Sequence, residues 1–132
     1  MAVPRAAGLA LAGLLFALPA RAGDKEDIVG SIESALALVI AGDFDTFLSK
    51  HVDPARLAGP KAVENWKAYS LRRAQTTAKP CLVDGHVKVD HWRGDPATED
   101  RVTVYLACGD GMPKPSSHRK VDGEWKITSV SW

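Results

Sequence analysis

Two histidines, His91 and His118, are the side chains of this chain best suited to acid–base chemistry. An imidazole titrates near neutral pH, so it can act as a general base or as a general acid. Side chains alternate along a strand, so His91 shares the predicted inner face with Val89. Pairing across the two-residue turn Asp122-Gly123 places His118 opposite Ile127, also on the inner side. Both histidines are therefore weak catalytic candidates. In the alternative, a β-bulge reverses the alternation and leaves them in water or in local hydrogen bonds.

Three aromatic side chains are suited to line the same cavity. Trp66 and Tyr69 belong to the third predicted helix, and Trp125 belongs to the last predicted strand. An aromatic ring that faces a cavity can stack on an apolar ligand. The predicted ligand-binding residues are therefore Trp66, Tyr69, His91, His118 and Trp125. The alternative that Trp125 is part of the core stays open.

No sequence motif points to a cofactor or to a metal. The chain has no Gly-x-Ser-x-Gly motif, no phosphate-binding loop, no dinucleotide fingerprint and no His-Glu-x-x-His motif. His86 and His91 lie on opposite faces of a strand, which argues against a metal shared between them. Asp84 and His86 share a face, which we expect to be solvated. We therefore expect no cofactor and no metal.

The two cysteines, Cys81 and Cys108, are predicted to form a disulfide. An exported chain with an even number of cysteines usually pairs them, and the pair lacks the Cys-x-x-Cys spacing of a redox dithiol. Closing this loop stabilises the fold by about 3–4 kcal/mol in the chain-entropy treatment. If both cysteines lie opposite each other on antiparallel strands, Val83 faces Leu106 and the valines share one face.

The N-terminus has the features of a secretory signal peptide. Arg5 precedes an apolar run from Ala6 to Leu18, and the small-residue site Ala20-Arg21-Ala22 follows. The run is too short to span a bilayer, and the alternative is a buried N-terminal helix. We expect cleavage between Ala22 and Gly23, which makes residues 1–22 the signal peptide and residues 23–132 a single domain. The predicted location is periplasmic or secreted, with no membrane attachment after the signal is removed.

The charge of the mature chain is close to zero. Loss of Arg5 and Arg21 lowers the 17 basic residues to 15, against 16 acidic residues. A nucleic-acid-binding protein needs a basic stripe that displaces counterions from phosphates. We therefore expect no nucleic-acid partner.

The period of the apolar residues predicts an α+β domain. Helical spacing indicates three helices, over residues 24–42, 43–53 and 60–75, with Asp24 and Asp43 as the N-caps of the first two.

After Pro80 the apolar period changes to two, which is typical of strands. One strand starts at Cys81, a second covers residues 102–108, and a final hairpin turns at Asp122-Gly123.

Two segments resemble the nuclear transport factor 2-like superfamily, which includes ketosteroid isomerases and polyketide cyclases. They are Ala41-Gly42-Asp43-Phe44-Asp45-Thr46-Phe47-Leu48 and Asp122-Gly123-Glu124-Trp125-Lys126-Ile127. Together with the order of helices and strands, the resemblance covers residues 24–132. It implies a cone in which a curved, mainly antiparallel sheet packs on three N-terminal helices and leaves a pocket at the wide end.

The resemblance does not identify a catalytic residue. Ketosteroid isomerases of this superfamily use a carboxylate base and a pair of acids that donate to an oxyanion. In this chain the valine-bearing strand faces carry no carboxylate in mid-strand, Asp43 is a predicted cap, and Asp100 begins a strand. A shared fold does not determine a shared function.

We therefore expect an exported, soluble, non-catalytic binding or accessory domain. Its predicted partner is a small hydrophobic ligand in an apolar pocket, a protein, or a second copy in a homodimer. One alternative is an enzyme of the isomerase or dehydratase type that uses a pocket histidine. The other is an exported inhibitor or immunity protein. The enzyme requires His91 and His118 at one enclosed cavity, whereas the inhibitor requires a filled interior and an exposed apolar patch.

Overall fold

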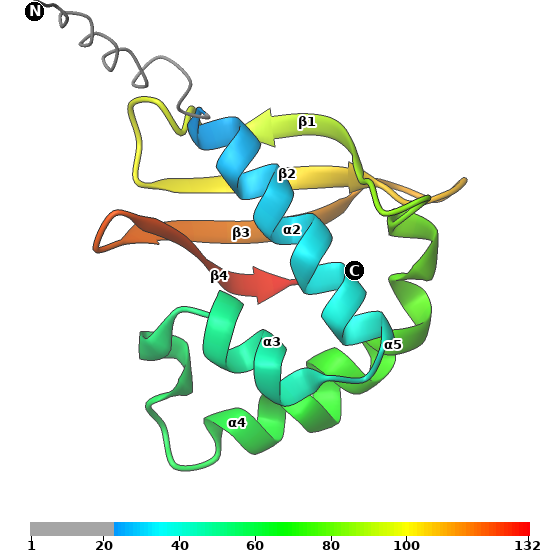
Figure 1. The fold of residues 1–132 in the computed structure, drawn as a ribbon, viewed down its shortest axis with the longest axis vertical. Coiled ribbons are helices and arrows are strands. Elements are labelled where there is room, and N and C mark those ends of the chain that lie inside the picture. The colour runs from blue at the N-terminus through cyan, green and yellow to red at the C-terminus, as the bar shows by residue number, and fades with distance from the viewer. Residues whose placement is uncertain (1–22) are drawn as a thin grey trace, which may run out of the picture.

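The computed structural model describes residues 23–132. It contains helices α2 (Asp24–Ile40), α3 (Phe44–His51), α4 (Ala62–Asn65) and α5 (Arg72–Thr77), followed by strands β1 (Lys88–Arg93), β2 (Arg101–Ala107), β3 (Lys114–Val121) and β4 (Glu124–Val130). The strands form one antiparallel sheet in the order β1-β2-β3-β4. Helix α2 crosses one face of this sheet, and the shorter helices gather beyond β4 (Figure 1). The predicted α+β class is confirmed, and the predicted signal peptide and the Ala22 side of its cleavage site lie outside the described residues.

Helix α2 forms because its apolar residues fall on one stripe. The fully buried members follow helical spacing and are Ile28, Ile32, Ala35, Leu36 and Val39. Gly42 ends the helix with φ of 84°, a conformation that glycine adopts at low cost. The predicted cap was wrong, because Gly23 is the N-cap and Asp24 is the first helical residue. The Asp24 carboxylate instead accepts hydrogen bonds from Trp125 Nε1 (3.0 Å) and Lys120 Nζ (3.2 Å).

Two aspartates organise the chain after α2. Asp43 caps α3 by accepting a hydrogen bond from the backbone N–H of Thr46, as predicted. Asp53 accepts a bond from Arg119 Nε on β3 (2.9 Å), and its own backbone N–H donates to the carbonyl of Ile127 on β4 (2.9 Å). These two bonds attach the helical end of the molecule to the sheet.

The predicted third helix is divided into segments. Helix α4 is followed by a π-helical segment, Trp66–Leu71, and then by α5. A 3₁₀ turn, Lys79–Cys81, leads from α5 towards the sheet. Cys81 therefore belongs to a turn and not to a strand.

The two predicted strand registers had different outcomes. The Asp122-Gly123 hairpin is confirmed, since His118 pairs with Ile127 and both turn residues have positive φ (50° and 83°). The Val83–Leu106 pairing was wrong, because Leu106 pairs with Val89.

A tight turn explains the wrong register. Asp84 and Gly85 adopt φ of 54° and 80°, and Val83 and His86 exchange backbone hydrogen bonds around them. This turn delays the start of β1 to Lys88. The Cys81–Cys108 disulfide itself is confirmed, with a Cα–Cα distance of 4.1 Å.

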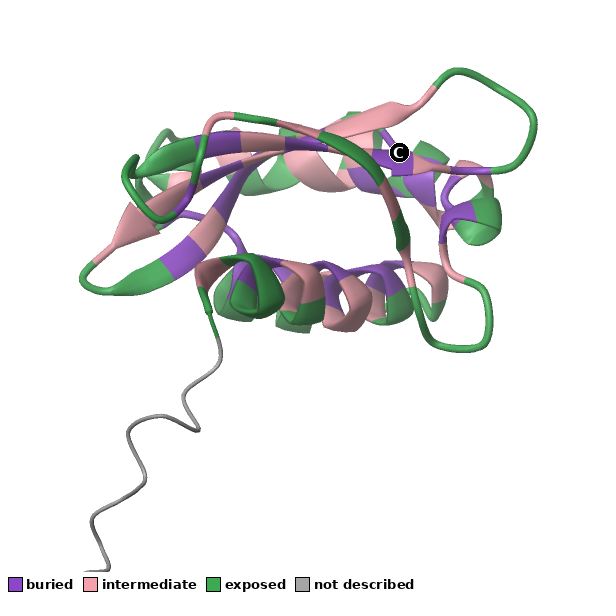
Figure 2. Ribbon diagram, turned by 90° about the horizontal axis from the view of Figure 1, so that it is seen from above, coloured by how far each residue is buried: buried purple, intermediate pink, exposed green. Residues whose placement is uncertain are grey.

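The space between the helices and the sheet is filled by side chains. Buried residues lie where α2 and the strands face each other (Figure 2). At the helical end Phe47 contacts the rings of Trp66 and Trp132, with centroids 6.1 and 6.3 Å away. Among residues 23–132, no helix is long and apolar enough to cross a membrane.

Candidate functional site

The sheet separates the two predicted catalytic histidines. A β-bulge between Val89 and His91 reverses the alternation of side chains in β1. The inward placement of His91 was therefore wrong. Its ring lies on the outer face of the sheet, stacked on Tyr105 at 4.2 Å, and its Nδ1 is 2.6 Å from Asp90 Oδ2.

His118 lies on the inner face, as predicted, but it is closed in. Its side chain is 2% exposed, and its Nε2 is hydrogen-bonded to Ser116 Oγ at 2.8 Å. Within residues 23–132 its Nδ1 has no hydrogen-bond partner. Burial lowers the pKa of His118 to about 3, so the ring is neutral at physiological pH. His118 and His91 thus share no cavity.

The three predicted aromatic residues are also dispersed. Trp66 packs on Phe47, whereas Tyr69 is 74% exposed beside it on the π-helical segment. Trp125 is buried and donates to Asp24. Trp66 and Tyr69 line one surface depression, whereas His118 borders a second and Trp125 a third.

A groove between α2 and β1 is a concave site with mainly apolar walls. We call it the α2–β1 groove; its volume is about 360 Å³, and it is lined by Lys25, Glu26, Val29, Gly30, Glu33, Val89 and Trp92. Uninterrupted alternation from Val89 would turn Trp92 to the outer face of the sheet. The bulge that moves His91 outward turns Trp92 inward, opposite Val104. Sequence reasoning missed this residue because no local signal marked the bulge.

Gly30 gives the groove its space. A Cβ atom at this position would meet no atom within 4 Å apart from its chain neighbours and its own helix backbone. Glycine inside a helix costs roughly 0.5–1 kcal/mol relative to alanine. No close contact among the described residues requires a glycine at position 30. The main structural effect of this glycine is the open surface above it.

Charged side chains border the groove at both ends. Lys25 Nζ lies 5.3 Å from the Trp92 ring centroid, within the range of a cation–π contact. At the other end Glu33 Oε2 accepts a bond from the backbone N–H of Val87 (3.0 Å) and lies 3.3 Å from His86 Nδ1. Glu33 therefore attaches α2 to the segment before β1 at this end of the groove.

A third histidine, His51, forms a site that sequence reasoning missed. Ser31 Oγ and Ser34 Oγ of α2 lie 3.2 Å from its Nδ1 and Nε2. Burial, with the nearby charges of Lys50 and Lys126, lowers the pKa of His51 to about 4. Both ring nitrogens are thus satisfied by hydroxyls and the ring is neutral, which indicates a structural role. The i, i+3 spacing of the two serines was the available sequence signal.

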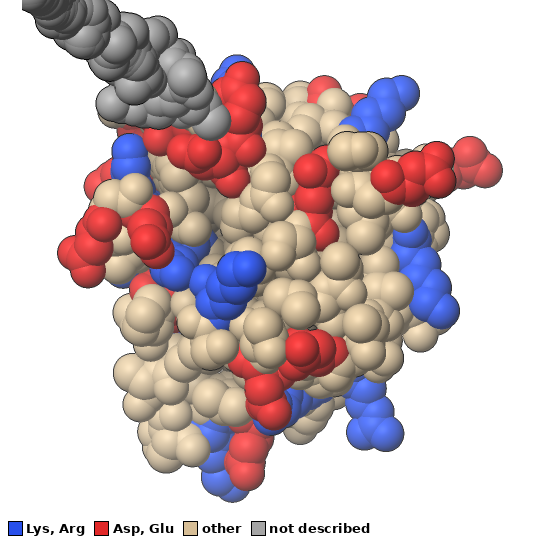
Figure 3. Space-filling view, viewed as in Figure 1, with Lys and Arg blue, Asp and Glu red and all other residues tan. Residues whose placement is uncertain are grey.

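The charge distribution does not favour a polyanionic partner. Lys, Arg, Asp and Glu side chains are interspersed on the face that carries α2 (Figure 3). No group of three or more metal-ligating side chains occurs in the described part of the chain.

Comparisons of this chain with protein-family models, with curated proteins and with solved structures found no match. Its function must therefore be argued from the geometry of the sites described above.

Proposed function

We propose that this protein is an exported, non-catalytic binding domain that holds a small apolar molecule in the α2–β1 groove. The observation that supports this most directly is a half-buried Trp92 beside the open surface of Gly30. An indole ring that is only partly covered can still gain free energy by burying its remaining apolar surface against a ligand.

The chemistry of the groove defines the ligand class. Val29, Val89 and Trp92 supply apolar walls, and the volume of about 360 Å³ suits a molecule of one or two rings. Lys25 already faces the Trp92 ring, and Glu33 is already hydrogen-bonded. A neutral aromatic or branched hydrocarbon is therefore the class that this groove fits best.

The resemblance to the nuclear transport factor 2-like superfamily belongs to this proposal. The order of helices before an antiparallel sheet, and the arch of that sheet over α2 in Figure 2, support a cone-shaped member. A periplasmic or secreted location is part of the same proposal and is supported by the Cys81–Cys108 disulfide.

The isomerase or dehydratase alternative lacks the shared cavity that it required. Acid–base catalysis needs a titratable group within hydrogen-bond reach of the substrate. His118 is enclosed, His51 is bonded by two serines, and His91 lies on the other side of the sheet.

A second candidate, a protein partner, rests on the free edge of β1. At the opposite edge Val52 forms a parallel bridge with Ile127 of β4. Among the described residues, none pairs with the outer edge of β1 itself. The short bridge between Val83 and His86 lies before this strand begins. An exposed edge strand can pair with a strand from another chain, including a second copy.

Binding of N-phenylnaphthylamine, a neutral fluorophore that brightens in apolar surroundings, tests the groove. We expect the wild-type protein to enhance its fluorescence and Gly30→Leu to weaken binding at least about tenfold, because the new side chain occupies the groove. Trp92→Ala should also weaken it, whereas Tyr69→Ala removes an exposed aromatic ring elsewhere and should not.

Equal binding by wild type and Gly30→Leu would contradict the groove proposal. Gly30→Ala tests the conformation of position 30 by stability instead of binding. It should raise the free energy of unfolding by about 0.5–1 kcal/mol, because alanine costs less than glycine inside a helix. Sedimentation velocity separates the second candidate, because a dimer without fluorophore binding would favour pairing at the β1 edge.

A further inference from the structure

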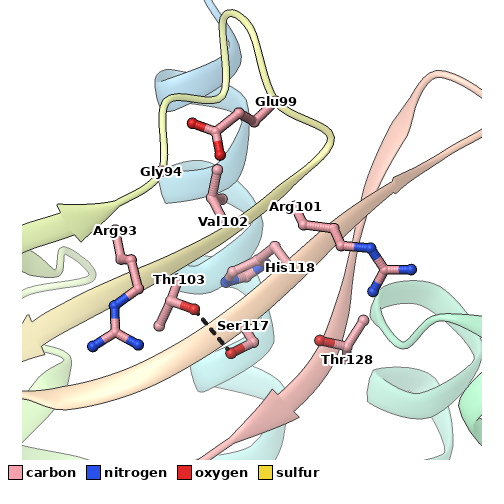
Figure 4. Close-up of a pocket in the computed structure, with 9 residues that line it drawn as sticks. All are labelled: Arg93, Gly94, Glu99, Arg101, Val102, Thr103, Ser117, His118 and Thr128. Atoms are coloured by element: carbon pink, nitrogen blue, oxygen red, sulfur yellow. Dashed lines mark hydrogen bonds between the residues drawn. The ribbon is translucent and has the colours of Figure 1, made fainter.

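A polar cleft lies on the outer face of the sheet, away from α2. We call it the outer-face cleft; its volume is about 340 Å³, and its side chains include Arg93, Arg101, Thr103, Ser117 and Thr128. Two residues of the inner face, Val102 and His118, also border it. It shares no residue with the α2–β1 groove. Figure 4 shows the two arginines on either side of the hydroxyl groups.

Both β-bulges of the sheet supply residues to this cleft. The bulge in β1 places Arg93 opposite Thr103, on the outer face, where uninterrupted alternation from Val89 would turn it inward. The second bulge makes Thr128 an extra residue of β4, between Ile127, which pairs with His118, and the next paired residue. Bulges redirect side chains and are enriched beside functional sites.

Two cations of the outer face already have acidic partners. Arg119 Nε is 2.9 Å from Asp53 Oδ2, and this hydrogen bond lowers the pKa of Asp53. Lys126 Nζ is 3.3 Å from Glu124 Oε1. Neither side chain offers its full charge to a ligand.

The two arginines of the cleft differ from these. Within residues 23–132, neither Arg93 nor Arg101 forms an ion pair, and both are exposed. The Arg93 guanidinium carbon lies 5.5 Å from the Tyr105 ring centroid, a contact that holds the side chain against the sheet and consumes no hydrogen-bond donor. Each guanidinium retains its donors for a ligand.

Hydroxyl groups occupy the space between the arginines. Thr103 Oγ1 and Ser117 Oγ lie 3.2 Å apart and form a hydrogen bond. One of the two hydroxyl groups donates in this bond, so the hydrogen of the other hydroxyl is free to donate to a ligand. Thr128 is 9% exposed and borders the same cleft. The one carboxylate of the lining, Glu99, accepts a bond from the backbone N–H of Asp95 (3.0 Å) and lies at the loop end of the cleft in Figure 4.

We propose that the outer-face cleft binds a small oxyanion: a phosphate, sulfate or carboxylate group, free or carried by a small molecule. Guanidinium groups bind such anions through paired N–H donors, and hydroxyl donors complete the coordination. The floor of the cleft is a hydrogen-bonded sheet, which fixes the backbone positions from which these side chains project.

An NMR titration tests the proposal. ¹⁵N-labelled protein is titrated with sodium phosphate, sodium sulfate or sodium acetate, and the amide and arginine side-chain resonances are followed. We expect saturable shifts centred on Arg101, Thr103 and Ser117 for at least one anion, and the order of affinities identifies the preferred group. Arg93→Gln and Arg101→Gln should each weaken binding about tenfold or more, because a hydrogen bond to a charged group is lost.

Arg72→Gln is the matched control, since Arg72 is an exposed arginine on α5, remote from the sheet face. Thr103→Val keeps the shape and both arginines and should weaken binding by a smaller factor. Equal weakening by Arg72→Gln, or unchanged binding by both cleft variants, would overturn the proposal, as would linear shifts for all three anions. Loss of fluorophore binding in the α2–β1 groove would not affect this test.

Discussion

His118 and His51 show what burial does to single residues of this chain. Each ring is buried and held neutral, with a pKa of about 3 for His118 and about 4 for His51. A neutral, enclosed imidazole has lost the property that made histidine attractive as a catalyst. Its remaining effect is on stability, because the unfolded chain binds a proton that the folded chain excludes.

This linkage gives a prediction for acidic pH. The folded pKa of His118 lies below its usual value of 6.5, so its contribution to stability is complete above that pH and is lost as the pH falls towards about 3. Between about pH 7 and about pH 5 we expect His118 to lower the free energy of unfolding by about 2 kcal/mol. His51 acts in the same direction.

Urea unfolding at several pH values measures this loss. His118→Leu should give a clearly flatter pH profile than wild type, whatever its effect on stability at neutral pH. The same slope in both proteins would show that His118 does not carry the linkage.

At the scale of the elements, the disulfide links the helices to the sheet. The 3₁₀ turn that carries Cys81 follows α5, and Cys108 follows β2, so the disulfide joins the helical segment to the middle of the sheet. The loop that it closes spans 27 residues and includes the whole of β1. This covalent link closes the segment that contains the edge strand β1, which contributes residues to both sites described above.

Removal of the disulfide should lower stability mainly through the unfolded chain. For Cys81→Ala/Cys108→Ala we expect the free energy of unfolding to fall by about 3–4 kcal/mol, since the loop entropy of the unfolded state rises. Urea unfolding of the double variant and of reduced wild type should agree. A loss below about 1 kcal/mol would mean that α5 and β2 are held together by packing alone.

At the scale of the whole molecule, the two proposed sites lie on opposite sides of one sheet. The apolar groove faces α2, and the polar cleft faces outward. A single bulge in β1 serves both, because it turns Trp92 towards one side and Arg93 towards the other. One irregularity therefore determines the chemistry of both faces.

Export of the whole protein is testable directly. In a bacterial host with a secretory pathway, we expect the mature chain to begin at Gly23 and to be lighter by two hydrogens than its reduced form. N-terminal sequencing and non-reducing intact mass measure both features. Ala22→Asp should block cleavage, and a cytoplasmic, full-length product from the wild-type gene would contradict the signal assignment.

Features that depend on neighbouring residues or on one pair of partners were predictable from the sequence. The apolar stripe around Ile32, the Asp43 cap and the Asp122-Gly123 turn follow from local backbone and periodicity rules, and they occur as expected. With only two cysteines in the sequence, the Cys81–Cys108 pairing had one solution. Local preference and a single covalent partner suffice for such features.

Only the tertiary structure decided which way the strand side chains face. A bulge adds one residue to a strand, and every side chain beyond it changes sides. Packing of Trp92 against α2 accompanies the bulge in β1. No residue type near Asp90 indicates that a bulge occurs there. The same uncertainty holds for Thr128 in β4. The candidate sites are therefore a product of packing between distant elements, which residue spacing along the chain does not encode.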